Sequence, residues 1–186
     1  MKAFPLHKFD TALVPLRPAV DTVFLIRAVE HPEQDNGVCR ALFHYLMQIS
    51  ATVIVPAHVL AEFEIRSQDR LPRTPRIIVG AFDESAARVM TSFGHTAMRD
   101  FKDKGYNKHV IRNDAYVAAT AARHHADALI TADEQPDMGE VCALAGVKLI
   151  HPGSLVLLPA QLDLVELAEL SAAGRLSAEK PAPEAE

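Results

Sequence analysis

One stretch near the middle of the chain, Val110 to Glu134, constrains the fold more than any other segment. Its first half is rich in alanine, a strong helix former with little bulk, so we expect a helix that lies close against a sheet. Its second half contains the short apolar run Ala128 to Thr131, which is too short for a buried helix and predicts a central strand. Asp114 falls in the opening turn of this expected helix, and Asp133 follows the strand. Helix starts and strand carboxyl ends are where α/β proteins present functional side chains.

The same alternation of short strands and helices extends over most of the chain. The expected strands end near Asp21 and cover residues 52–55, 76–79 (a strand or a connection), 128–131 and 147–150, and the expected helices cover 22–26, 39–49, 58–66, 84–101, 110–125 and 138–145. Such alternation predicts an α/β fold with a parallel sheet. The carboxyl ends of parallel strands meet at one edge, so Asp21 and Asp133 should lie together there, with Glu62 and Asp114 on adjoining helices.

Size and composition limit the class of protein. The chain has 186 residues, of which 49% are hydrophobic, enough for one domain with a sizeable core. The net charge of −5 excludes a polybasic protein, so any nucleic-acid contact must rest on local patches. Its two cysteines lack zinc-site spacing and suggest a reducing cytoplasm. We expect neither a signal peptide nor a bilayer-spanning segment.

The ends of the chain differ from its centre. Residues 1–17 contain prolines and should be irregular, and residues 18–155 should form the main domain. Residues 156–176 should form a helical extension, because the segment QLDLVELAEL within it is amphipathic and could cover its own domain or a second copy. Residues 177–186 are rich in proline, alanine and glutamate and should be disordered.

Four carboxylates, those of Asp21, Glu62, Asp114 and Asp133, are candidates for a metal site. Clustered carboxylates repel one another, so a compact group requires a cation or bound protons. Their hard oxygen atoms suit Mg²⁺ or Mn²⁺ together with substrate phosphate. The chemistry that such a site permits is hydrolysis of a phosphodiester.

The chain resembles the PIN-domain nucleases, a family that includes the VapC toxins of bacterial toxin–antitoxin pairs. The similar pieces are AVDTVFLIRA, IVPAHVLAEFEI, NDAYVAATAARHHADALITADE and VKLIHPGSL, which together span about residues 18–155. The resemblance implies a three-layer α/β/α domain that uses Mg²⁺ or Mn²⁺ to cleave RNA in the cytoplasm. It implies that Asp21, Glu62, Asp114 and Asp133 form the acidic quartet, with Asp137 as an auxiliary metal ligand. An antitoxin protein and a second copy of the chain are the partners it implies.

Two departures from the family pattern affect these expectations. Val23 stands where the family usually has a small polar residue, which favours an alternative, a catalytically weak PIN-fold module that binds RNA or protein. The chain also extends beyond the domain at both ends, which leaves its identity as a toxin open. Val23 argues against a haloacid-dehalogenase-like phosphatase, which needs an acid at that place. A receiver domain would need paired acids after the first strand, and Asp21 has no acidic neighbour.

Each candidate residue also has a purely structural interpretation. Asp21 and Asp137 could cap helices, Glu62 could pair with Arg66, Asp114 could favour a helix dipole, and Asp133 could stabilise a turn. Other polar groups have two interpretations each: Thr22 and Thr131 as site or turn hydroxyls, His124–His125 as a metal pair or a helix end, and Arg66, Arg70, Arg73 and Arg76 as a phosphate-binding or solvated group. We favour the helix end for the histidines.

Overall fold

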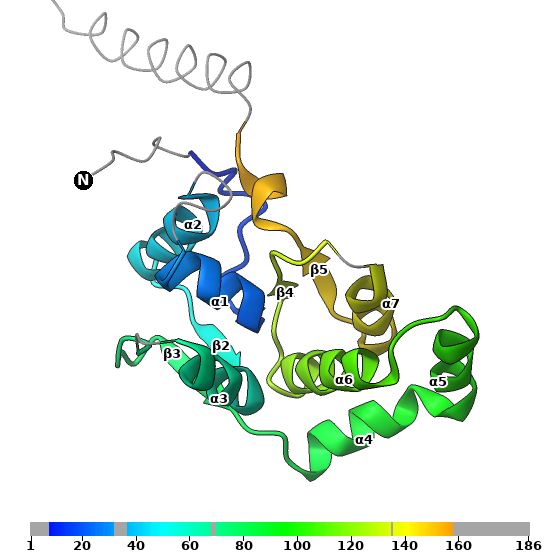
Figure 1. The fold of residues 1–186 in the computed structure, drawn as a ribbon. Helices are drawn as coiled ribbons and strands as arrows, with labels where there is room; N and C mark the ends of the chain where they lie inside the picture. Colours follow the sequence, from blue (N-terminus) through cyan, green and yellow to red (C-terminus); the bar gives the residue numbers. More distant parts are fainter. Residues whose placement is uncertain (1–7, 32–36, 68–69, 135, 158–186) are drawn as a thin grey trace, which may run out of the picture.

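The protein, in a computed structural model, is built around one sheet of five parallel strands (Figure 1). The structure describes residues 8–31, 37–67, 70–134 and 136–157. The strand order is β3-β2-β1-β4-β5, formed by β1 (Pro18–Val20), β2 (Val53–Pro56), β3 (Ile77–Gly80), β4 (Ala128–Ile130) and β5 (Lys148–Ile150). The sheet confirms the predicted parallel α/β class, and residues 77–80 are a strand rather than a connection.

Helices cover both faces of this sheet. The helices are α1 (Thr22–Val29), α2 (Val38–Gln48), α3 (Ala57–Arg66), α4 (Glu84–Ser92), α5 (Gly94–Asp103), α6 (Lys108–Arg123) and α7 (Pro136–Ala145), followed by the short 3-10 helix η2 (Pro152–Leu155). The chain first moves outward from β1 to β3 and then returns to β4 and β5, and right-handed crossovers in opposite directions place their helices on opposite faces. Accordingly α1 packs against α2 and α3, while α6 packs against α4 and α7 (Figure 1).

Helix α6 lies directly on the sheet, as its alanines predicted. Ala115, Ala118, Ala119 and Ala121 are completely buried, and the helix contacts both β2 and β4. Small side chains permit this close approach of a helix to a sheet. The helix therefore holds its polar residues at a fixed height above β2 and β4, the strands on either side of β1.

Two expectations about helix ends are wrong. Helix α6 begins at Lys108, with Asn107 as its N-cap, so Asp114 lies in the second turn instead of the opening turn. The dipole acts mainly over the first turn, and it does not account for Asp114 at this position. The expected helix over 84–101 is two helices, because Gly94 adopts a positive φ of 77° between them. Asp83 is the N-cap of α4 and accepts a hydrogen bond of 2.9 Å from the backbone N–H of Ala86.

The two ends of the described chain pair with each other. Phe9 forms an isolated antiparallel bridge with Val156, and the N–H of Leu157 donates to the carbonyl of Lys8 at 2.9 Å. The predicted helix within 156–176 and the predicted disordered tail at 177–186 fall on residues beyond 157, outside the described part of the chain. Among the described residues, no helix is long and apolar enough to cross a bilayer.

Candidate active site

The two strand-end aspartates lie at the point where the sheet reverses direction. β1 and β4 are neighbours, and the chain leaves them toward opposite edges of the sheet. Asp21 directly follows β1, and Asp133 lies just past β4. In open parallel sheets, this switch point is where the crevice for a ligand forms.

A cleft of about 820 Å³ opens at this point and contains the four predicted carboxylates. Asp21 and Asp133 reach it from the sheet, Glu62 from α3 and Asp114 from α6. The other lining residues are Thr22, Val23, His58, Ala61, Ile65, Arg66, Val110, Asn113, Tyr116, Val117 and Met138. The two helices come from opposite faces of the sheet, so the cleft lies between the two outer layers of the fold.

Asp21 is held in place by hydrogen bonds to both of its carboxylate oxygens. The N–H of Phe24 donates to Oδ1 at 2.7 Å, and the hydroxyl of Thr131 donates to Oδ2. The first bond makes Asp21 the N-cap of α1, so the predicted capping role is correct. The same side chain also lines the cleft. Burial raises the pKa of Asp21 to about 6, aided by the charge of Asp133, although the two hydrogen bonds oppose this rise.

The pKa of Asp114 is raised by burial and by the neighbouring acids of the cleft, which shows that the charges of these acids interact. Burial and the charges of four other acids together raise this pKa from 3.8 to about 7; after burial, the effects decrease in the order Asp137, Asp21, Asp133 and Glu62. All five acids singled out in the sequence therefore interact electrostatically. A carboxyl with a pKa near 7 is about half protonated at neutral pH, which partly relieves the repulsion.

Asp137 occupies a different position from the predicted helix cap. It lies in the first turn of α7 and is only 4% exposed, and the N–H of Met138 donates to its Oδ1 at 3.0 Å. Of the four acids that raise the pKa of Asp114, it has the largest effect. Its position therefore connects it to the cleft through Asp114.

Glu62 has partners on both of its carboxylate oxygens. The guanidinium of Arg66, one turn further along α3, lies 2.8 Å from Oε1, as the predicted helix pair requires. The hydroxyl of Thr22 donates to Oε2 at 2.7 Å and links α1 to α3. The ion pair and the cleft position again coexist, so the structure does not force a choice between them.

The hydroxyls of the two threonines bind carboxylates of the cleft. Thr22 holds Glu62, and Thr131 holds Asp21 while also accepting the backbone N–H of Asp133 at 2.9 Å. In the described part of the chain, no group of three His, Cys, Asp or Glu side chains is close enough together to hold a metal ion. The acids are close enough to couple electrostatically, but their oxygens are oriented by neighbouring protein groups.

Three cleft residues were missed by the sequence interpretation: His58, Asn113 and Tyr116. Their positions offered a signal, since His58 lies one helical turn before Glu62, and Asn113 and Tyr116 flank Asp114 on α6. Val23, the departure from the family pattern, also lines the cleft and presents an apolar side chain there.

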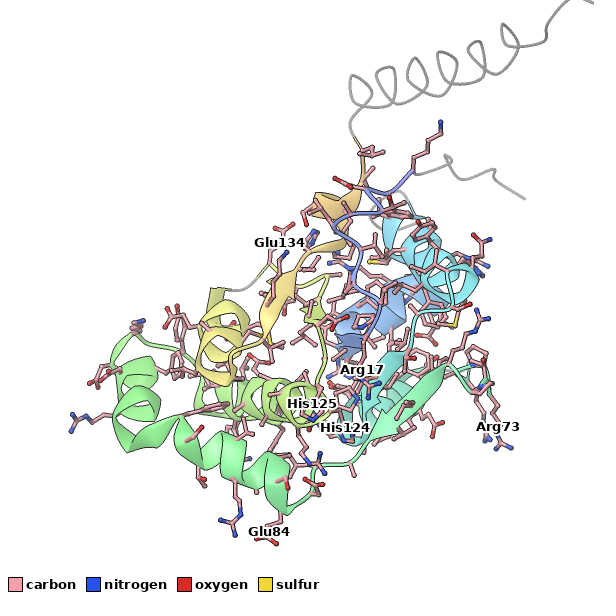
Figure 2. All side chains as sticks on the ribbon, turned by 180° about the vertical axis from the view of Figure 1, so that it is seen from behind. Arg17, Arg73, Glu84, His124, His125 and Glu134 are labelled. Atoms are coloured by element: carbon pink, nitrogen blue, oxygen red, sulfur yellow. The ribbon has the colours of Figure 1, made fainter. Side chains whose placement is uncertain are left out.

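The remaining candidates lie away from this cleft. His124 is the C-cap of α6, where its carbonyl accepts from Nε of Arg17 at 3.0 Å, and His125 follows with φ of 53° (Figure 2). The helix-end interpretation of the two histidines is confirmed. Arg73, with Arg70, lines a separate cavity of about 590 Å³ beside β3 (Figure 2). Arg76 is directed elsewhere and donates to the carbonyl of Met47. Of the four arginines, Arg66 lines the acidic cleft.

The chain is similar to a protein-family model and, more distantly, to solved structures. The family model described as "PIN domain" matches residues 19–142. A solved structure of FitAB bound to an IR36 DNA fragment is 20% identical, with a TM-score of 0.49, and the match covers 73% of this chain and 94% of that one. A crystal structure of VapBC2 from Rickettsia felis, bound to a promoter DNA fragment, is 16% identical with a TM-score of 0.47, covering 73% and 98%. No curated protein matches the sequence.

Proposed function

Because the chain belongs to the PIN domain family, whose members are nucleases, we propose that it is a metal-dependent endoribonuclease. The observation that carries the proposal is that four carboxylates from separate elements line one cleft, and the raised pKa of Asp114 agrees with this. Such a group of acids destabilises a folded protein unless a cation or protons compensate for it. Its placement in an open cleft at the sheet's switch point favours a ligand site over a structural one.

The residues in the cleft fit a hard divalent cation. Asp21, Glu62, Asp114 and Asp133 would hold Mg²⁺ or Mn²⁺, with Asp137 as an auxiliary ligand, because carboxylate oxygens are the ligands these ions prefer. When bound, the ion would lower the pKa of an attacking water and stabilise charge on the phosphodiester.

The protein's own groups would prepare the cleft for this ion. Thr131 and the N–H of Phe24 fix the orientation of Asp21, and Thr22 fixes Glu62. Asp114, with its pKa of about 7, would release its proton as a cation enters. Metal binding near neutral pH should therefore be accompanied by proton release.

Cleavage of RNA under metal control tests this proposal. The full chain should cut single-stranded RNA in Mg²⁺ or Mn²⁺, lose activity in EDTA, and recover it when metal is restored. Asp114→Asn should abolish cleavage. Asp103→Asn makes the same chemical change on exposed α5, outside the cleft, and should retain it. An Asp114→Asn variant as active as the wild type would refute the proposed site.

A catalytically weak binding module is the second candidate, and Val23 favours it. An apolar side chain in the cleft cannot supply the hydrogen bond that a polar residue would give to a carboxylate or water. If the wild type binds RNA without cutting it while Val23→Thr gains metal-dependent cleavage, the binding module is correct.

The biological role and the assembly are further proposals. The resemblance to VapC toxins supports a cytoplasmic toxin that is neutralised by an antitoxin protein and forms a homodimer. Residues 18–155 would be the nuclease domain and residues 156–176 a helical extension. Growth arrest on expression of the wild type, absent for Asp114→Asn and relieved by the product of an adjacent reading frame, would support the toxin role. Normal growth at high expression would oppose it.

A further inference from the structure

One wall of the acidic cleft is aromatic. His58 and Tyr116 both line the cleft, and their ring centroids lie 6.1 Å apart with an interplanar angle of 65°. Tyr116 also packs edge-to-face on Phe82, with centroids 4.8 Å apart at 80°. The rings come from α3, α6 and the segment before α4, so tertiary folding assembles the group.

The aromatic wall lies beside the carboxylates. His58 is one turn before Glu62 on α3, and Tyr116 on α6 packs against His58 and lines the same cleft as Asp114. Residues one turn apart on a helix are about 5–6 Å apart at Cβ. Since one sugar joins each base of a nucleic acid to its phosphate, a phosphate at the acids would bring an adjoining base to these rings.

The aromatic rings of this wall remain accessible to a ligand. Phe82 is 36% exposed and Tyr116 is only partly buried, so neither ring is fully buried in the core. His58 is also only partly buried, and it lines the cleft.

We propose that Tyr116, supported by His58 and Phe82, is a base-stacking subsite for single-stranded RNA beside the acidic cleft. The inference rests on the proposed function and adds the residues that would contact a base of the substrate. Every base has a π-face, so stacking on an aromatic ring binds single strands with little sequence preference. In a duplex the bases are already stacked on one another, and this subsite could not reach them.

Fluorescence of 2-aminopurine in a single-stranded RNA oligonucleotide tests the subsite without requiring cleavage. The full-length Asp114→Asn protein serves as the non-cleaving background, and the fluorescent base is placed at each position in turn. We expect quenching at one or two adjacent positions. Tyr116→Leu in this background should remove the quenching and weaken binding by about 5- to 150-fold, the loss expected for one base–aromatic stack. Tyr116→Phe should retain both.

Tyr106→Leu is the matched control, because Tyr106 packs on Phe101 outside the cleft and its loss should leave the quenching unchanged. An oligonucleotide without a base at the quenched position, bound by the protein with Tyr116 intact, should lose affinity to a similar extent. This arm keeps the test valid if Tyr116→Leu fails to fold. Double-stranded RNA of the same sequence should compete poorly.

The outcomes separate the subsite from the nuclease. RNA cleavage by the wild type without Tyr116-dependent quenching would overturn the subsite and leave the nuclease standing. Quenching that depends on Tyr116 without any metal-dependent cleavage would support the subsite and refute the nuclease. Equal binding of duplex and single strand would overturn the proposed strandedness.

Discussion

At the residue scale, the acids of the cleft oppose the stability of the metal-free fold. Asp21 and Asp114 both have raised pKa values, to about 6 and about 7, from an ordinary value of 3.8. Between the unfolded and folded pKa values, the folded state binds more protons than the unfolded state. The free energy of unfolding should therefore fall as the pH rises through that window.

The first prediction is that the metal-free protein melts at a lower temperature at pH 8 than at pH 5, and that this difference is smaller for Asp114→Asn. At pH 8 the variant should melt higher than the wild type, by about 2–4 °C for each kcal/mol of relieved repulsion. Calorimetry in EDTA at several pH values measures both effects. A variant that melts well below the wild type at every pH would show that Asp114 is a structural residue.

The second prediction concerns Arg66, whose guanidinium competes with any cation for Glu62. Arg66→Gln should tighten Mn²⁺ binding severalfold, because the carboxylate is released and the cleft becomes more negative. The loss of an exposed helix pair should cost only about 0.2–0.5 kcal/mol. Arg88→Gln removes the corresponding pair with Glu84 on α4 and is the control that should leave Mn²⁺ affinity unchanged. Calorimetric titration with Mn²⁺ decides; equal affinity in the wild type and Arg66→Gln would exclude this competition.

At the element scale, α6 determines where Asp114 and Tyr116 stand. The helix can lie on β2 and β4 because its inner face consists of alanines that are completely buried. Any increase in volume on that face must displace the helix or distort the strands. The geometry of the cleft therefore depends on side chains that do not themselves line it.

The third prediction is that Ala118→Leu lowers the free energy of unfolding by about 1–3 kcal/mol, the usual cost of overpacking. Cleavage should fall as well, because displacement of α6 moves Asp114. Ala143→Leu makes the same change on the exposed surface of α7 and should have little effect on either. Thermal melting and RNA cleavage are the measurements. A fully active, equally stable Ala118→Leu variant would mean that the position of α6 does not determine the geometry of the cleft.

At the scale of the whole molecule, the fold connects its two described ends. Asp10 donates its backbone N–H to the carbonyl of Leu155 at 2.9 Å, next to the bridge between Phe9 and Val156. The chain beyond this pairing is leucine-rich, and the sequence predicts a helix there that covers apolar surface of the same or a second copy.

The fourth prediction is that truncation after Pro159 lowers the melting temperature or promotes aggregation. This end point retains the pairing between residues 8–10 and 155–157, so any effect reports on the segment beyond it. Melting and light scattering over a range of protein concentrations provide the test. Unchanged stability and solubility would show that the segment is an independent tail.

The sequence by itself determined the features that depend on neighbours along the chain. The apolar runs predicted four of the five strands and left residues 76–79 open between a strand and a connection, and the alanine pattern predicted that α6 lies against the sheet. These features follow from backbone hydrogen bonding and side-chain periodicity over a few residues. The sequence also placed Asp21 and Asp133 at strand ends, because strand boundaries are local signals.

Only the tertiary structure decided which distant groups meet. The bond from Thr22 to Glu62, the packing of Phe82 on Tyr116 and the pKa of Asp114 all depend on residues far apart in the sequence. Burial and Coulomb interactions act through space, and no local pattern encodes them. For that reason the acids and the local pair of Glu62 with Arg66 could be predicted from the sequence, whereas the partners distant in the chain and the aromatic wall of the cleft could be identified only in the folded chain.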